Sequence, residues 1–204
     1  MRLNNKVAIV TGGIRGIGYA TVEAFLREGA KVILTASSPA SAEKAVASLK
    51  EKYPEAVVEG ISPELTSLAS VQEAFNEVLK KHGRIDILVN NAGMSERTLL
   101  NDYTEELFDK VMDLNVKGVF NASRAVVDAM TAQGSGVILS TSSMVSKYGQ
   151  PAGFTYPASK FAVNGITLSL ARELGPKGIR VNAVAPGITE TDMMKAVPSL
   201  SLNP

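Results

Sequence analysis

The chain has 204 residues with a hydrophobic content of 45%, so we expect one globular domain, residues 1–204, with a sizeable core. Its formal net charge of +1 gives no reason to expect nucleic acid or an anionic membrane as a partner, and the absence of cysteine excludes disulfides and thiolate metal sites. No apolar run is long enough for a membrane span and the first apolar run begins at residue 6, so we expect neither a span nor a signal peptide, and a cytoplasmic protein.

Short apolar runs alternate with helical patterns along the chain. The apolar, β-branched runs predict strands at 6–11, 31–35, 56–61, 85–90, 136–142 and 179–184. The helical patterns fall at 16–28, 40–52, 67–82, 104–131 and 154–174. Strands that alternate with helices are typical of a parallel sheet covered on both faces. We therefore predict an α/β, Rossmann-like, doubly wound fold.

A glycine-rich loop follows the first predicted strand. The stretch Gly12-Gly13-Ile14-Arg15-Gly16-Ile17-Gly18 separates this strand from a helical pattern. Glycines allow a tight turn and a close approach to a pyrophosphate, and the N-terminus of the next helix attracts its charge. The loop therefore indicates a dinucleotide site, and the alternative is an ordinary glycine-rich turn.

The only histidine, His82, precedes Gly83 at the predicted end of a helix. A cation is favourable there, so we interpret His82 as a structural residue. One histidine without cysteine argues against a zinc dehydrogenase and for a reaction that depends on tyrosine.

The long helical pattern at 104–131 contains two poor helix formers, Asn115 and Gly118. From the residues alone, this could be a weak point in a surface helix. Further along, Ser142 and Ser143 end the fifth predicted strand, where ligands bind in such sheets. Side chains alternate along a strand, so only one of the two serines should face a site.

Tyr156 and Lys160 lie four residues apart in a predicted helix, which places both on one face. A neighbouring ammonium favours the phenolate, so we expect Lys160 to lower the pKa of Tyr156 from its ordinary value of about 10. A phenol that ionises near neutrality is a good proton donor or acceptor. The alternative is a partly exposed tyrosine beside a solvated lysine.

Taken together, these motifs resemble those of the short-chain dehydrogenase/reductases. Their order and spacing agree from residue 6 to about residue 194, and the shared residues are Thr11-Gly12-x-x-x-Gly16-x-Gly18, Asn90-Asn91-Ala92-Gly93, Asn115, Ser143, Tyr156-x-x-x-Lys160 and Pro186-Gly187. Within the family the chain resembles 3-oxoacyl-[acyl-carrier-protein] reductases most.

The resemblance implies an NADPH-dependent reduction of a ketone. Tyr156 would protonate the carbonyl oxygen, Ser143 would stabilise its charge, and Lys160 would hold the nicotinamide ribose. Asn115 would lie at a kink and position a water that links Lys160 to solvent. The implied substrate is a 3-oxoacyl thioester of fatty acid biosynthesis, either free or carried on acyl carrier protein. The alternatives are a steroid or small secondary-alcohol dehydrogenase, or a non-catalytic dinucleotide-binding protein.

The resemblance also implies the cofactor contacts. Family members that prefer NAD carry an acidic residue after the second strand, whereas this chain has Ala36-Ser37-Ser38. Ser37 and Arg15 can both bind a 2′-phosphate, which favours NADP(H). The contacts expected along the dinucleotide are Gly12, Ile14, Arg15, Gly16, Ile17, Gly18, Ser37, Glu64, Leu65, Asn91, Ala92, Gly93, Tyr156, Lys160, Pro186, Gly187, Thr189 and Thr191. Of these, Glu64 would accept from the adenine amino group, and Asn91, Ala92 and Gly93 would face the adenosine ribose.

Members of the family normally continue well beyond the position at which this sequence stops. We therefore expect the domain to lack the last strand and the C-terminal segment of the family fold. The helical segments 104–131 and 154–174, through which the family often assembles, are complete. A homodimer or homotetramer is the expected state.

Overall fold

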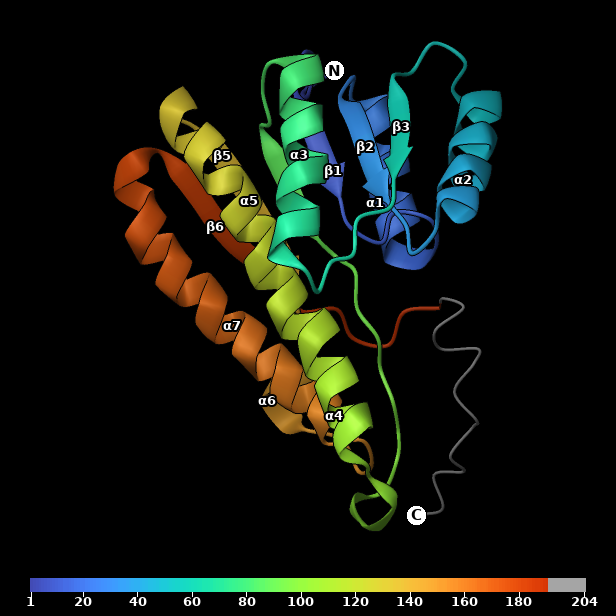
Figure 1. Ribbon diagram of the computed structural model, residues 1–204, viewed down its shortest axis with the longest axis vertical. Coiled ribbons are helices and arrows are strands. Elements are labelled where there is room, and N and C mark those ends of the chain that lie inside the picture. The colour runs from blue at the N-terminus through green and yellow to red at the C-terminus, as the bar shows by residue number, and fades with distance from the viewer. Residues whose placement is uncertain (191–204) are drawn as a thin grey trace.

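The computed structural model describes residues 1–190 and contains one six-stranded parallel sheet with the strand order β3-β2-β1-β4-β5-β6 (Figure 1). The strands are β1 (Val7–Val10), β2 (Lys31–Thr35), β3 (Val58–Ile61), β4 (Ile87–Asn90), β5 (Gly136–Thr141) and β6 (Ile179–Val184). The helices are α1 (Gly16–Arg27), α2 (Pro39–Lys52), α3 (Leu68–His82), α4 (Glu105–Met112), α5 (Gly118–Gln133), α6 (Val145–Tyr148) and α7 (Thr155–Leu174). Short 3-10 turns occupy Leu100–Asp102 and Gly175–Lys177.

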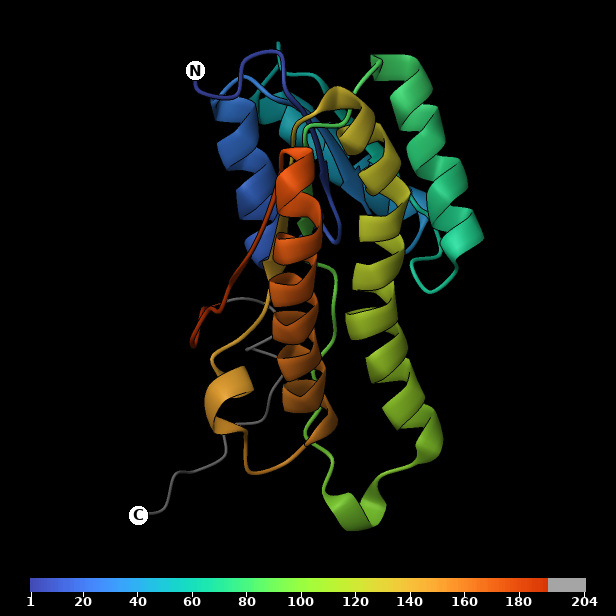
Figure 2. The same ribbon diagram turned by 90° about the vertical axis from the view of Figure 1, so that its left-hand side faces the viewer.

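The central strands β1, β2 and β4 are buried on both faces, which explains their apolar runs, whereas buried residues alternate with more exposed ones in the edge strand β6. In β1, Val7 and Ile9 belong to the core that includes residues of α3, α5 and α7, whereas Ala8 and Val10 belong to the core on the other face, with residues of α1 and α2. Figure 2 shows α1 on one side of the sheet and α3 and α5 on the other. The predicted doubly wound α/β fold is confirmed.

The strand order reverses between β1 and β4. The chain passes outward from β1 through β2 to β3, and then returns to pair β4 with the other edge of β1. Loops that leave two such strands turn in opposite directions and open a crevice at the carboxyl ends, where ligands bind in folds of this kind.

Asp86 fixes the other ends of these two strands. Its carboxylate accepts a hydrogen bond from the backbone N–H of Val7 at 2.9 Å and from Arg84 Nε at 2.8 Å. Burial raises the pKa of Asp86, but the hydrogen bonds from Arg84, Val7 and Lys6 outweigh it and leave this pKa below its ordinary value. The negative charge of Asp86 therefore helps to hold β1 beside β4.

The predicted strands and helices are present, with two differences. The single helix expected over 104–131 is divided into α4 and α5 by a π-helical turn, Asp113–Lys117. The short helix α6 lies in a segment for which no element was predicted. Within residues 1–190, no helix is long and apolar enough to cross a membrane.

Candidate active site

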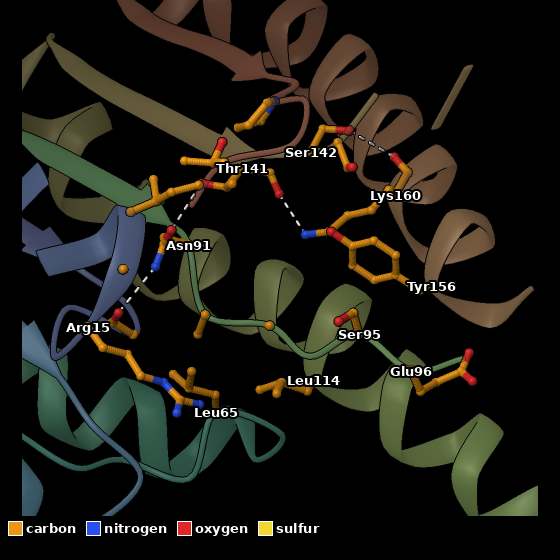
Figure 3. A pocket seen from close by; sticks show the side chains of 18 of the residues that line it. Arg15, Leu65, Asn91, Ser95, Glu96, Leu114, Thr141, Ser142, Tyr156 and Lys160 are labelled. Carbon is orange, nitrogen blue, oxygen red and sulfur yellow. Dashed lines mark hydrogen bonds between the residues drawn. The ribbon is translucent and has the colours of Figure 1, made fainter. Parts of the chain in front are cut away.

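A cavity of about 930 Å³ lies at the carboxyl ends of the strands. The loops that follow all six strands contribute to its lining, as do Leu114 of the π-turn and Tyr156 and Lys160 of α7. Figure 3 shows Arg15 and Leu65 towards one end of this cavity and Tyr156 and Lys160 towards the other. The residues predicted from the two ends of the sequence therefore share a single cavity.

The glycine loop lies against the segment that follows β4, with no room for side chains. A Cβ added to Gly12, whose φ is +64°, would lie 2.9 Å from the Cα of Ala92. A Cβ on Gly18 would lie 2.3 Å from the carbonyl oxygen of Gly12 and 2.4 Å from Nδ2 of Asn91. The loop leaves its backbone open to the cavity at the start of α1, as a pyrophosphate site requires.

Two polar side chains join the glycine loop to the β4 segment. Asn91 donates from Nδ2 to the carbonyl oxygens of Thr11 and Gly12, at 3.1 and 3.2 Å. The hydroxyl oxygen of Thr11 accepts from the backbone N–H of Asn91 and of Ala92, at 2.9 and 3.0 Å. From the sequence, Asn91 was expected only to contact the ribose, and Thr11 had no expected role beyond the shared motif. Both side chains set the shape of the loop.

The residues expected around the adenosine end line the cavity. They are Ile14, Arg15, Gly16, Ile17, Ser37, Glu64, Leu65, Asn91, Ala92 and Gly93. One carboxylate oxygen of Glu64, Oε1, accepts from the backbone N–H and the hydroxyl of Thr66, at 3.2 and 2.8 Å. One oxygen of the Glu64 carboxylate is thus already occupied by hydrogen bonds from Thr66. The contact of Glu64 with adenine stays a prediction. Asn121, which the sequence analysis missed, donates to the Leu65 carbonyl oxygen at 2.8 Å and fixes this wall.

Asn115 lies within the π-turn and is fully buried. Its side chain exchanges two hydrogen bonds with the backbone of Met94, each 2.9 Å long, and donates a third to the Ser159 hydroxyl at 3.0 Å. Single π-turns inside helices are frequent at functional sites. The interruption expected at Asn115 is present, and its amide ties the segment after β4 to α7. The water expected there stays a prediction.

The two serines after β5 face different surroundings, as alternation requires. Ser142 is buried, and its hydroxyl donates towards Ser146 Oγ and the carbonyl oxygen of Lys160, each at 3.3 Å. Ser143 lies in the cavity, where its hydroxyl partly lowers the pKa of the Tyr156 phenol. Ser143 is therefore the serine that can meet a ligand oxygen beside Tyr156.

Lys160 is only 5% exposed, and burial lowers its pKa from the ordinary value of 10.5 to about 8. Its Nζ donates to the carbonyl oxygen of Thr141 at 2.7 Å and lies 5.7 Å from the centre of the Tyr156 ring. The alternative of a partly exposed tyrosine beside a solvated lysine is therefore wrong for the lysine, whereas Tyr156 is partly exposed.

The expected direction of the Tyr156 pKa is wrong. Burial raises the pKa of this phenol above 10, and the hydroxyl of Ser143 only partly opposes the shift. Lys160 carries its charge at neutral pH, but it is neutral at the higher pH at which the phenol would titrate, so its charge does not lower the pKa of Tyr156. Tyr156 is consequently protonated at neutral pH.

The remaining residues predicted to contact the cofactor follow β6 in the sequence. Pro186, Gly187 and Thr189 line the cavity. Thr191 lies outside the described residues. The cavity also contains residues that the sequence analysis left without a role, among them Glu96 and Arg97. They follow β4 in a loop without a recognisable pattern, so no signal in the sequence pointed to them.

Comparisons with known proteins agree with this geometry. The family model described as short chain dehydrogenase matches residues 6–200. The 3alpha-hydroxysteroid dehydrogenase of Mediterraneibacter gnavus is 56% identical over 204 residues, which are 100% of this chain and 82% of the relative. The 3-oxoacyl-[acyl-carrier-protein] reductase of Thermotoga maritima is 42% identical over 201 residues, or 97% of this chain and 80% of the relative.

Solved structures of other proteins share the fold of this chain. The crystal structure of levodione reductase superposes with a TM-score of 0.91 at 35% identity, covering 95% of this chain and 76% of that chain. The structure of NAD+-bound xylitol dehydrogenase gives a TM-score of 0.87 at 35% identity, covering 92% and 72% respectively.

Proposed function

The chain belongs to the short chain dehydrogenase family, and we propose that it interconverts a ketone and a secondary alcohol with NADP(H) as the cofactor. The observation that carries this proposal is the meeting of Ser143, Tyr156 and Lys160 with the glycine loop in one cavity.

The cavity has the chemistry that a dinucleotide needs. Gly12 and Gly18 leave backbone where a side chain would collide, and the N-terminus of α1 faces the same space. When bound, the nicotinamide supplies a hydride to the carbonyl carbon in the reductive direction. Arg15 and Ser37 would bind the 2′-phosphate, since neither they nor their neighbours Ala36 and Ser38 bring a carboxylate that would repel it.

Tyr156 donates the proton that the carbonyl oxygen takes up, so that the ketone becomes an alcohol. Its raised pKa keeps the phenol protonated at neutral pH, which suits reduction. Ser143 donates a hydrogen bond to the same oxygen while negative charge develops there. Lys160, charged below about pH 8, holds the ribose next to Tyr156 and favours the loss of the proton during the reaction.

We propose a hydroxysteroid, or its ketone, as the substrate class. The support is the 56% identity to a 3alpha-hydroxysteroid dehydrogenase, against 42% to a 3-oxoacyl-[acyl-carrier-protein] reductase. Apolar side chains such as Leu114, Met144 and Ile188 line the cavity and suit a rigid apolar ring system. The 3-oxoacyl thioester favoured by the sequence motifs, free or on acyl carrier protein, is the second candidate.

Turnover by the full chain with NADPH tests the choice of substrate. A 3-keto steroid and an acetoacetyl thioester are compared by the loss of absorbance of the reduced nicotinamide. We expect a higher kcat/KM for the steroid. A higher value for the thioester would favour the second candidate, and no turnover of either with retained NADPH binding would favour a non-catalytic dinucleotide-binding protein.

We also propose that the chain forms a homodimer or homotetramer through the outer faces of α5 and α7. Phe120, Phe161 and Leu168 are apolar side chains on these helices with exposed fractions of 51%, 51% and 70%. A second copy of this chain would remove them from water. Sedimentation of the wild type and of Phe161→Glu checks this, since the variant should shift towards a smaller species.

A further inference from the structure

A buried polar cluster, formed by Glu96, Tyr103 and Thr155, lies beside the catalytic end of the cavity. Its atoms are Glu96 Oε1, the Tyr103 hydroxyl and Thr155 Oγ1, and none of them has a hydrogen-bond partner of regular geometry in the described structure. Glu96 lines the cavity, and Figure 3 places it on the side of Tyr156 and away from Arg15. The reaction described above uses none of the three residues.

The donors and acceptors of this cluster are complementary. Burial is the main cause that raises the pKa of Tyr103; the carboxylate of Glu96 raises it further, and the hydroxyl of Thr155 lowers it. These directions fit a phenol that donates to Glu96 and accepts from Thr155. Buried polar atoms are costly unless they are paired, so the three groups stabilise the fold only as a set.

Further contacts fix Glu96 in this position. Its second carboxylate oxygen accepts from the Thr98 N–H at 2.8 Å, and its carbonyl oxygen accepts from Gln150 Nε2 at 3.2 Å. Gly153, with a φ of +74°, passes so close that a Cβ there would lie 2.1 Å from the Glu96 carbonyl oxygen. The backbone of Glu96 is thus held against the loop that leads into α7.

The other end of the cluster is the start of α7. Thr155 is the first residue of this helix and immediately precedes Tyr156. Phe154, at the N-cap position, makes no side-chain cap hydrogen bond, so the usual means of holding a first helical turn is lacking. The ring of Phe154 packs against that of Tyr103, with 4.8 Å between the ring centres. The cluster therefore ties the first turn of α7 to the loop after β4.

We propose that Glu96 is a positioning residue for Tyr156, which acts through Tyr103 and Thr155 on the first turn of α7. Asn115 makes a separate connection between the same two segments, from Met94 to Ser159. Two connections hold the start and the interior of the catalytic helix against one wall of the cavity. The effect of Glu96 on turnover rests on the function proposed above, whereas its effect on the order of α7 does not.

Deuterium exchange of the full chain tests the effect on the helix. The variants are Glu96→Ala, Glu96→Gln and Tyr103→Phe, and the control is Glu173→Ala, which removes an exposed carboxylate from α7. We expect Glu96→Ala and Tyr103→Phe to accelerate exchange in residues 153–162 about tenfold without changing residues 11–18. Glu96→Gln should have a smaller effect, because its amide oxygen still accepts, and Glu173→Ala should have none.

Steady-state kinetics then separate positioning from general stability. Glu96→Ala should lower kcat about tenfold to a hundredfold and leave the dissociation constant for NADPH unchanged, and Glu96→Gln should restore most of kcat. Unchanged exchange in 153–162, or equal acceleration in 11–18, would overturn the inference. If the wild type lacks turnover, the proposed function fails, and the exchange result alone decides the role of Glu96.

Discussion

The ammonium of Lys160 donates a hydrogen bond to the backbone carbonyl of Thr141 at 2.7 Å, at the end of β5. The contact joins the catalytic helix to the sheet. It also holds the ammonium group where little water reaches it, since Lys160 is only 5% exposed. One carbonyl does not replace the water that a lysine loses on burial, and its pKa falls to about 8 for this reason.

This pKa predicts a rise in stability with pH between about 8 and 10. Lys160 keeps its proton up to about pH 10.5 in the unfolded chain, but only to about pH 8 in the folded one. The unfolded chain therefore binds more protons in this window, and unfolding becomes more costly as the pH rises, by up to about 2 kcal/mol. Above this window the raised pKa of Tyr156 acts in the opposite direction.

Urea unfolding at several pH values, with Lys160→Met for comparison, measures the effect. The free energy of unfolding of the wild type should rise relative to that of the variant from pH 8 to 10. Parallel curves for the two proteins would show that Lys160 has an ordinary pKa in the fold.

Ser143→Ala should lower kcat about a hundredfold, because the hydroxyl that stabilises the developing oxyanion is lost. Ser142→Ala is the matched control, since Ser142 is adjacent but bonds to Ser146 and to the backbone of Lys160. The control should lose about 1 kcal/mol of stability and keep most of kcat. The reverse outcome, with Ser142→Ala inactive and Ser143→Ala active, would show that Ser142 and not Ser143 is the serine of the site.

Arg15→Ala should weaken NADPH binding about tenfold, which is the size of one charge-assisted hydrogen bond, and leave NADH binding unchanged. Arg97→Ala is the control, because Arg97 also lines the cavity but follows β4. Fluorescence titration of both cofactors gives the dissociation constants. An equal loss for NADPH and NADH in Arg15→Ala would mean that Arg15 does not recognise the 2′-phosphate.

Gly18→Ala should destabilise the fold by about 1–3 kcal/mol and remove dinucleotide binding, because its methyl group would overlap the backbone of Gly12. Gly165→Ala in α7 is the control, since a Cβ there meets nothing within 4 Å. It should raise stability by about 0.5–1 kcal/mol, as expected for alanine in a helix. Thermal unfolding with and without NADPH measures both; normal cofactor binding by Gly18→Ala would contradict the loop geometry.

The sequence was sufficient for the fold because its local patterns agree with the tertiary structure. Strands buried on both faces are apolar over most of their length, as in β1 and in residues 87–89 of β4, and the glycine loop lies between a strand and a helix as predicted. The division of the 104–131 helix by a π-turn follows from the contacts of Asn115 with Met94 and Ser159, which are distant in sequence. No local pattern encodes those contacts.

The residues of the candidate site could be predicted from the sequence, but the pKa shifts of these residues could not. The spacing of Tyr156 and Lys160 predicts a shared face, and both line the cavity. It does not predict how deeply they are buried, and burial reversed the expected pKa shift of Tyr156. Glu96 remained undetected because a single carboxylate in an irregular loop carries no periodicity; only the fold brings it to Tyr103 and Thr155.

The most direct test of the proposed reaction compares Tyr156→Phe with the wild type, using NADPH and a 3-keto steroid. We expect the variant to bind NADPH as tightly as the wild type but to lose about a hundredfold to ten-thousandfold in kcat, because the phenol proton is missing. A variant that keeps most of the wild-type turnover would contradict the role of Tyr156 as proton donor and, with it, the proposed mechanism.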